Sequence, residues 1–156
     1  MSLPALDLDL TLNPKFTYTS SVHWDELDSL GMLHNSRFAA HVERAIISWY
    51  YAQGGRWEAN VEDNPDQHHV VRSMTIEFLA PVTSPGTMHI DIWVERLGTT
   101  SCTYGFSCSS TDGMITHARG ERTIIRLDPH SKRPTPWTGL FRTRHQTLTK
   151  DLPAMP

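Results

Sequence analysis

The sequence predicts an α+β domain in which an antiparallel five-stranded sheet wraps around one long central helix. Three features give this prediction: one strand-like segment near the N-terminus, one apolar helical stripe after it, and four further strand-like segments with no convincing helix between them. The 156 residues fit one domain, large enough to bury a core without disulfides or a structural metal.

The first strand is expected over residues 15–24, which are rich in Thr, Tyr, Val and Phe. Residues 25–34 contain one glycine and several polar side chains without a sustained period, so they are expected to form a loop. Loops that follow a strand often carry functional residues. The sequence therefore directs attention to this loop first.

The helix is expected to start at about Asn35 or Ser36, because both residue types are good N-caps. Gly54-Gly55 is expected to end it. Its apolar stripe has the spacing of one helical face and consists of Phe38, Val42, Ala45, Ile46 and Trp49.

The four later strands show alternation of apolar and polar residues. We expect these apolar sets to share a face: Val70, Met74, Ile76 and Phe78, with Arg72 interrupting; Met88, Ile90, Ile92 and Val94; Cys102, Tyr104, Phe106 and Cys108. The last strand is expected within residues 114–127, after a hairpin turn at Asp112-Gly113. Its poor alternation over residues 118–120 predicts a bulge or a close approach of another backbone.

These elements divide the chain into an N-terminal arm (1–14), one domain (15–142) and a C-terminal tail (143–156). Within the Pro-, Lys- and Arg-rich segment after Asp128, residues 137–148 are expected to form a short helix packed on the surface.

The composition argues against several classes of partner. Against 17 Asp and Glu there are 14 Lys and Arg, giving a net charge of −3 without a basic run, so we expect no nucleic-acid partner. The start of the chain lacks a signal-peptide pattern and no apolar stretch is long enough to span a membrane, so a soluble cytoplasmic protein is expected. Cys102 and Cys108 lie six residues apart in one strand, roughly 20 Å, and are expected to be buried free thiols.

The segment from Val22 to Arg44, together with the order of elements, resembles the 4-hydroxybenzoyl-CoA thioesterase group of the hotdog superfamily over residues 15–142. The matching pattern is Glu26-Leu27-Asp28-Ser29-Leu30-Gly31, then Asn35 seven residues after the Asp, and Glu43-Arg44-Ala45 in the helix. Residues 74–81 and Pro85-Gly86 look like the family's next strand and turn. Many members have His in place of Met32 and Asn in place of His34.

The resemblance implies a hotdog-fold acyl-CoA thioesterase that needs no cofactor, because a small or medium acyl-CoA is the substrate. It implies that Asp28 is the general base or the nucleophile, and that the backbone N–H of Asn35 at the helix start stabilises the oxyanion. Glu43, beside the small residues Ala39 and Ala40, is a second catalytic candidate. Gly31, Met32 and His34 are the expected substrate-binding residues.

Each residue also has a purely structural interpretation. Asp28 is a typical turn residue, Asn35 is a typical helix cap, Glu43 could pair with a neighbouring base on the surface, and His34 could be merely solvated. His68-His69 does not indicate a metal, because adjacent strand residues point to opposite faces and no further ligands accompany them.

Two other functions compete with hydrolysis. A hotdog hydratase or dehydratase would carry an Asp five residues before a His within an Asn-Pro helix start, whereas Asp28 and His34 are six apart here without Asn-Pro. A non-catalytic acyl-thioester binding protein is the other alternative. The resemblance further implies a homodimer, or a dimer of dimers, with sheets joined edge to edge and the active site between subunits.

Overall fold

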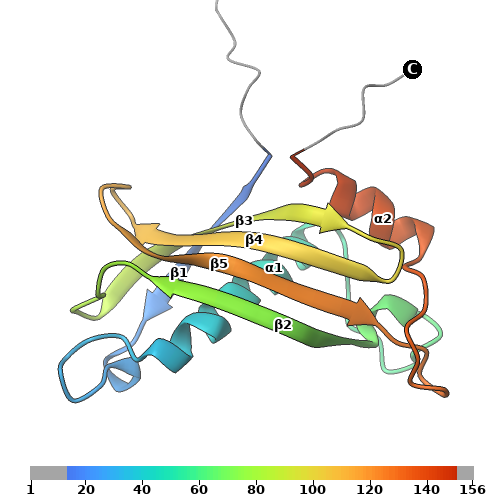
Figure 1. Ribbon diagram of the computed structural model, residues 1–156, viewed down its shortest axis with the longest axis horizontal. Helices are drawn as coiled ribbons and strands as arrows, with labels where there is room; N and C mark the ends of the chain where they lie inside the picture. The colour runs from blue at the N-terminus through green and yellow to red at the C-terminus, as the bar shows by residue number, and fades with distance from the viewer. Residues whose placement is uncertain (1–13, 151–156) are drawn as a thin grey trace, which may run out of the picture.

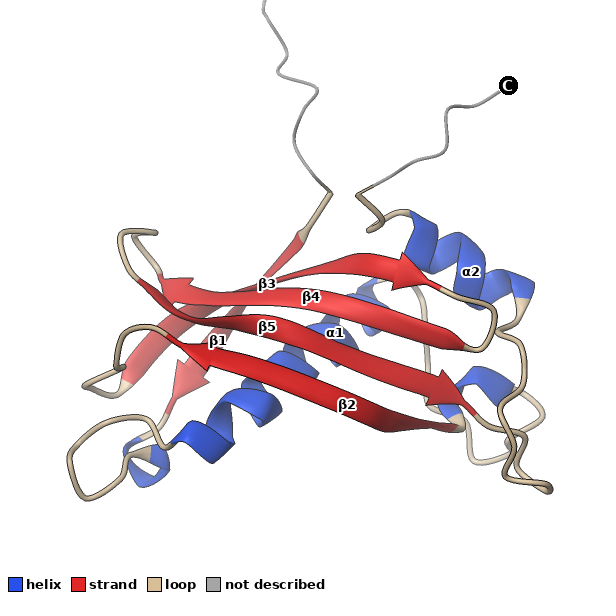
Figure 2. Ribbon diagram, viewed as in Figure 1, coloured by secondary structure: helices blue, strands red, loops and turns tan. Residues whose placement is uncertain are grey.

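The computed structural model describes residues 14–150, so the arm predicted over residues 1–14 falls almost entirely outside the described residues, as do residues 151–156. The predicted α+β architecture is confirmed: five antiparallel strands form one sheet, and a long helix crosses one face of it (Figures 1 and 2). The strands are β1 (Phe16–Val22), β2 (His69–Phe78), β3 (Gly86–Leu97), β4 (Ser101–Ser110) and β5 (Thr116–Arg126). Their order in the sheet is β1-β3-β4-β5-β2, which leaves β1 and β2 at the two edges.

The core lies between the sheet and α1 (Phe38–Ala52). The apolar sets predicted for β3 and β4 are buried as expected, including the free thiols Cys102 and Cys108. Four residues of the predicted helical stripe are also buried, namely Phe38, Val42, Ala45 and Trp49. Because one face of the helix and one face of the sheet are apolar, each covers the other.

The helix begins differently from the sequence-based expectation. A 3-10 turn, η2 (Asn35–Arg37), runs directly into α1, and the side chain of His34 caps it by accepting the Ser36 N–H at 3.2 Å. The His34 imidazole thus takes the N-cap role predicted for Asn35 or Ser36. Because helical backbone already begins at Asn35, the N-cap position lies one residue earlier than the residue types suggest.

A bulge in β2 corrects one predicted set of residues. Val71 pairs with Ile124 and Ser73 with Thr123, so Arg72 is an extra residue. An extra residue reverses the alternation beyond it. Val70 therefore does not share a face with Met74 and Ile76; it is 48% exposed, whereas those two pack against the core.

The sequence predicted a bulge or a close approach of another backbone around residues 118–120 of the last strand, and β5 has both features there. His117 is an extra residue in β5 opposite Cys108 and Ser109 of β4. At Gly120, an added Cβ would lie 1.9 Å from the carbonyl oxygen of Thr75 in β2, so the two backbones approach too closely for any side chain.

The C-terminal segment is part of the folded unit. The short helix predicted over residues 137–148 is confirmed as α2 (Gly139–Gln146), and the boundary predicted after residue 142 falls inside it. Phe141, His145 and Leu148 are buried against the domain. Thr138 caps α2 by accepting the Phe141 N–H at 3.2 Å.

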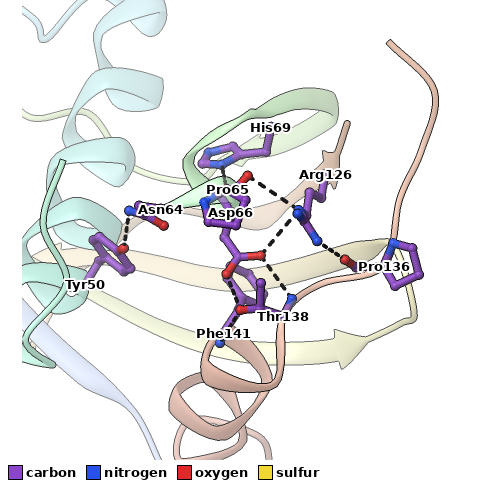
Figure 3. A network of polar contacts seen from close by, with 9 residues as sticks. All are labelled: Tyr50, Asn64, Pro65, Asp66, His69, Arg126, Pro136, Thr138 and Phe141. Carbon is purple, nitrogen blue, oxygen red and sulfur yellow. Dashed lines mark hydrogen bonds and ion pairs between the residues drawn. The ribbon is translucent and has the colours of Figure 1, made fainter. Parts of the chain in front are cut away.

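Figure 3 shows how Asp66, which is buried, ties this helix to the chain before β2. Its carboxylate accepts hydrogen bonds from the backbone N–H and the hydroxyl of Thr138 and lies 3.5 Å from Arg126 Nε. The C-terminal segment is therefore fastened to the domain by polar contacts as well as by the core.

Candidate active site

Asp28 lies in a tight hairpin-like loop between β1 and the helix. Leu27 and Leu33 form an antiparallel bridge, and the Asp28 N–H donates to the Met32 carbonyl at 2.7 Å. Gly31 donates its N–H to the Asp28 carbonyl at 3.0 Å and has a φ of +73°, in the left-handed region that favours glycine. Gly31 thus shapes the turn that carries Asp28.

The two carboxylate oxygens of Asp28 have different surroundings. Oδ1 accepts the backbone N–H groups of Leu30 at 2.8 Å and Met32 at 3.1 Å. Oδ2 accepts no hydrogen bond from any residue between 14 and 150. The turn interpretation of Asp28 is thus correct for one oxygen, while the other remains available to a water molecule or a substrate.

A backbone donor lies in the same region, at the start of η2. His34 provides acceptors for the amides two and three residues further on, its ring Nδ1 for Ser36 and its carbonyl for Arg37 at 2.9 Å. The N–H of Asn35 donates to no acceptor within the described part of the chain. First-turn amides of a helix have no intrahelical acceptor, and the positive end of the macrodipole adds to their affinity for an anion.

These groups surround one pocket of about 330 Å³ at the N-terminal end of α1. It brings together four predicted site residues, Asp28, Met32, His34 and Asn35, with an apolar wall from the end of β2. The rings of Phe38 and Phe78 meet edge to face at 5.4 Å between centroids and connect the helix to this wall. The other lining residues are Leu33, Leu79, Ala80, Pro81 and Val82.

The wall after β2 is held by the bulge in β5. The carbonyl of His117 accepts the N–H groups of Leu79 at 2.9 Å and Ala80 at 3.2 Å, and its ring Nδ1 lies 3.1 Å from the Ala80 carbonyl. Across the pocket, the Leu33 N–H donates to the Val82 carbonyl at 2.8 Å. The bulge thus positions backbone next to the Asp28 loop.

Glu43 does not line this pocket. It lies two turns further along α1, where its Oε1 is 3.0 Å from Nη2 of Arg122, and both line a second, largely apolar cavity of about 240 Å³. The carboxylate is half exposed, so this ion pair contributes little to stability by itself. Within one chain, Asp28 and Glu43 belong to different pockets.

Sequence reasoning missed a buried polar cluster beside the Asp28 loop, formed by Ser20, Glu26 and His41. One signal for it was present. His41 follows Phe38 by three residues and precedes Ala45 by four, so a polar side chain occupies the buried stripe of the helix.

The comparisons with known proteins agree with this fold. The model of the thioesterase-like superfamily matches residues 22–143, and the chain belongs to this superfamily. It is accordingly a thioester hydrolase with the hotdog fold. No curated protein sequence that we compared matches the chain.

Solved structures of other proteins share the fold. The 1,4-dihydroxy-2-naphthoyl-CoA thioesterase from Synechocystis superposes with a TM-score of 0.73 at 14% identity, covering 83% of this chain and 94% of that one. A thioesterase from Thermus thermophilus, complexed with coenzyme A and Zn, has a TM-score of 0.69 at 23% identity, with coverages of 85% and 92%. A putative thioesterase from Pseudomonas aeruginosa has a TM-score of 0.70 at 23% identity, with coverages of 81% and 95%.

Two further observations concern ligands and membranes. Among residues 14–150, no group of three or more His, Cys, Asp or Glu side chains is arranged to hold a metal ion. Over the same range, no helix is both long and apolar enough to cross a bilayer.

Proposed function

We propose that the chain is an acyl-CoA thioesterase acting on small or medium acyl groups, with Asp28 as the catalytic carboxylate and the Asn35 N–H as the oxyanion donor. One observation carries the proposal: Asp28, which has one unengaged carboxylate oxygen, and Asn35, which has an unengaged N–H, line the same pocket. Thioester hydrolysis needs both a base or nucleophile and an oxyanion donor.

In the general-base form of the reaction, Asp28 takes a proton from a water molecule that attacks the thioester carbonyl carbon. The negative charge that develops on the carbonyl oxygen is stabilised by the Asn35 N–H. The carbon–sulfur bond then breaks, and the proton on Asp28 returns to the leaving thiolate. In the nucleophilic form, Asp28 attacks the carbonyl carbon, the carbon–sulfur bond breaks to release the CoA thiolate, and the resulting mixed anhydride is hydrolysed by water to the free acid and the Asp28 carboxylate. A burst of CoA release equal to the enzyme concentration would identify this form.

His34 and Met32 are proposed to contact the substrate. Because Nδ1 of His34 accepts the Ser36 N–H, a neutral His34 carries its proton on Nε2, which can donate to a substrate oxygen. Met32 is half-buried and can adapt to acyl groups of different shape.

Asp28→Asn tests the carboxylate. Asparagine keeps an acceptor for the Leu30 and Met32 amides but loses the charge, so the loop keeps its turn while hydrolysis falls by at least about 100-fold. Release of CoA from a panel of acyl-CoAs, followed with a thiol reagent, measures this. Asp128→Asn is the matched control, because Asp128 Oδ1 caps another turn by accepting the N–H groups of His130 at 3.0 Å and Ser131 at 2.7 Å. Unchanged activity in Asp28→Asn would refute the role of Asp28.

Asn35→Pro tests the oxyanion donor, because proline lacks the N–H and is tolerated at the first position of a helix. His34 has φ −61° and ψ 136°, which a following proline accepts. We expect a loss of about 100-fold or more in kcat for Asn35→Pro and near-normal kcat for Asn35→Ala, which keeps the N–H. Equal activity of the two variants would rule out the donor.

We also propose that the protein forms a homodimer through β2. This edge strand pairs only with β5 among the described strands, and at its ends Val70, Val71, Phe78 and Leu79 are 46–52% exposed. An unpaired apolar edge is a template for another strand, and a two-fold axis pairs such a strand with its copy antiparallel. Since Phe78 and Leu79 also line the Asp28 pocket, a partner at this edge would help to enclose that pocket.

The dimer gives Glu43 a catalytic role. Its ion-pair partner Arg122 lies opposite Met74, near the middle of β2, so Glu43 would lie close to the dimer axis and could orient water in the partner's site. Mixing Asp28→Asn and Glu43→Gln subunits tests this. If the two residues act across the interface, each mixed dimer regains one intact site, and random mixing restores about a quarter of wild-type activity. If they act within one chain, mixing restores none.

Light scattering at micromolar concentration should give about 35 kDa, twice the chain mass of 17.7 kDa, or about twice that for a dimer of dimers. Val71→Lys should reduce the mass to that of the monomer, because it places a charge among the exposed apolar side chains of the edge strand that the proposed interface buries. Met114→Lys is the control, since Met114 is 83% exposed but lies in the turn between β4 and β5. A monomeric wild-type protein would contradict the shared site.

A further inference from the structure

A buried polar cluster joins three elements next to the Asp28 loop. His41 of α1 is fully buried; its Nδ1 lies 2.6 Å from Oγ of Ser20 in β1, and its Nε2 lies 3.1 Å from Oε1 of Glu26 in η1 (Trp24–Glu26). Ser20 is 1% and Glu26 6% exposed. Such a serine–histidine–carboxylate row resembles a nucleophilic triad, but none of the three lines the Asp28 pocket, so substrate does not reach Ser20.

The surroundings of His41 define its protonation state. Nδ1 faces two donors, the hydroxyl of Ser20 and, at 3.4 Å, Nη1 of Arg44. Nδ1 is therefore the acceptor, and the proton of the neutral ring lies on Nε2, towards Glu26. Burial lowers the pKa of His41, and the positive charge of Arg44 acts in the same direction, whereas Glu26 opposes it. The ring is thus neutral at pH 7.

Glu26 is ionised in this cluster. Burial alone would raise its pKa, but the His23 N–H, which donates to Oε2 at 2.8 Å, and the nearby His41 and Arg44 together lower it. Arg44 Nη1 lies 3.8 Å from Oε1 and is half exposed. A largely buried carboxylate is therefore held between the helix and the backbone that precedes it.

Hydrogen bonds of Glu26 connect the cluster to the loop that carries Asp28. The carboxylate of Glu26 binds the chain where the loop begins, and the carbonyl of the same residue accepts the His34 N–H at 3.0 Å where the loop ends. Leu27 and Leu33 then form the bridge that closes the hairpin, and Asp28 follows directly. Any shift of Glu26 relative to α1 therefore moves Asp28 relative to the Asn35 N–H.

Packing alone does not require these groups. Buried charged and polar groups can often be replaced by apolar side chains of similar volume without loss of stability, whereas a polar cluster imposes one specific geometry. We propose that His41, with Glu26 and Ser20, is a positioning residue that holds the Asp28 loop against the first turns of α1 in the geometry needed for thioester cleavage. This inference rests on the proposed role of Asp28.

Variants of His41 separate its two contacts. In His41→Asn, the side-chain amide takes the place of Nδ1 near Ser20, but no atom takes the place of Nε2 near Glu26. In His41→Gln, the longer side chain reaches the position of Nε2 near Glu26. We expect His41→Asn and Glu26→Gln to lower kcat by about 10- to 100-fold with KM changed less than about threefold, because a shift of about 1 Å in a catalytic group has effects of this size. His41→Gln should recover most of the lost kcat.

The control is His145→Asn, which removes another buried histidine, bonded to Tyr104 and contacting Trp49 at the opposite end of α1. It should lower stability but leave kcat within about twofold of wild type. If His41→Asn and Glu26→Gln also keep kcat within about twofold, or if His41→Gln and His41→Asn are equally impaired, the proposal is wrong.

Amide hydrogen exchange tests positioning without relying on activity. In His41→Asn, exchange at Asp28, Met32 and His34 should accelerate at least about tenfold relative to His145→Asn, because their hydrogen bonds depend on the loop geometry. If wild type cleaves no acyl-CoA but exchange accelerates, the thioesterase proposal fails and the positioning role of His41 stands. Unchanged exchange at these amides overturns the positioning role, whatever the activity.

Discussion

Acidification should destabilise the protein through His145, and the structure sets the size of the effect. His145 is 1% exposed, its Nδ1 lies 2.8 Å from the Phe141 carbonyl, and its Nε2 lies 2.6 Å from the Tyr104 hydroxyl. Nδ1–H therefore donates and Nε2 accepts, so the ring is held neutral. Burial is the main cause that lowers the pKa of His145 from 6.5 to about 4.

Between these two pKa values the unfolded chain binds more protons than the folded chain, so the free energy of unfolding decreases as the pH falls. The contribution of His145 is complete above about pH 6.5. It falls by about 2 kcal/mol between pH 7 and pH 5, and by about 3 kcal/mol once the pH is below 4. His41 and Glu26, whose pKa values are also lowered, change stability in the same direction.

The comparison of wild type with His145→Gln isolates this contribution. Glutamine does not titrate, so the variant should lose about 2 kcal/mol less between pH 7 and pH 5, even if its stability at pH 7 is lower. Urea unfolding at several pH values, followed by tryptophan fluorescence at one fixed protein concentration, measures both curves. If the two curves are parallel, His145 does not titrate as its burial requires.

Three further variants test the packing of the fold by urea unfolding. Gly120→Ala should destabilise the protein by at least about 3 kcal/mol, because its Cβ would meet the carbonyl oxygen of Thr75 at 1.9 Å; a loss below about 1 kcal/mol would show that the strands can separate. Thr138→Ala should lose about 2 kcal/mol, because it removes the cap of α2 and two donors to the buried Asp66, and a neutral result would contradict the network in Figure 3. Phe38→Ala should lose about 3–5 kcal/mol, since Phe38 is 3% exposed; Leu140→Ala, at a position 59% exposed, should lose less than about 0.5 kcal/mol.

The location of the Asp28 loop was predictable because its signals are local. A strand-like segment ends, polar residues and a glycine follow, and an apolar helical stripe begins. The roles within the loop were not all predictable. His34 was predicted only to bind substrate, and the structure shows that it caps the helix. For Asp28, the turn geometry decides that one carboxylate oxygen accepts hydrogen bonds while the other is unengaged.

The cluster around His41 shows what residue patterns omit. Its three members lie at positions 20, 26 and 41, and nothing in their spacing indicates that they meet. They meet because β1 and α1 pack against each other, so the contact depends on how two elements are oriented. A polar residue in an apolar stripe reveals only that a buried partner is needed.

By itself the sequence determined the class of fold, because the periodicities of a helix and of strands arise from backbone geometry within each segment. It also located the irregularity near Gly120, but it treated Arg72 only as a polar residue within an apolar face and did not predict the bulge that turns Val70 to the other face. Only the tertiary structure decided which two strands lie at the edges of the sheet, where α2 packs, and that Glu43 lies in a different pocket from Asp28. These depend on strand order and register, which are set by contacts between residues far apart in the chain.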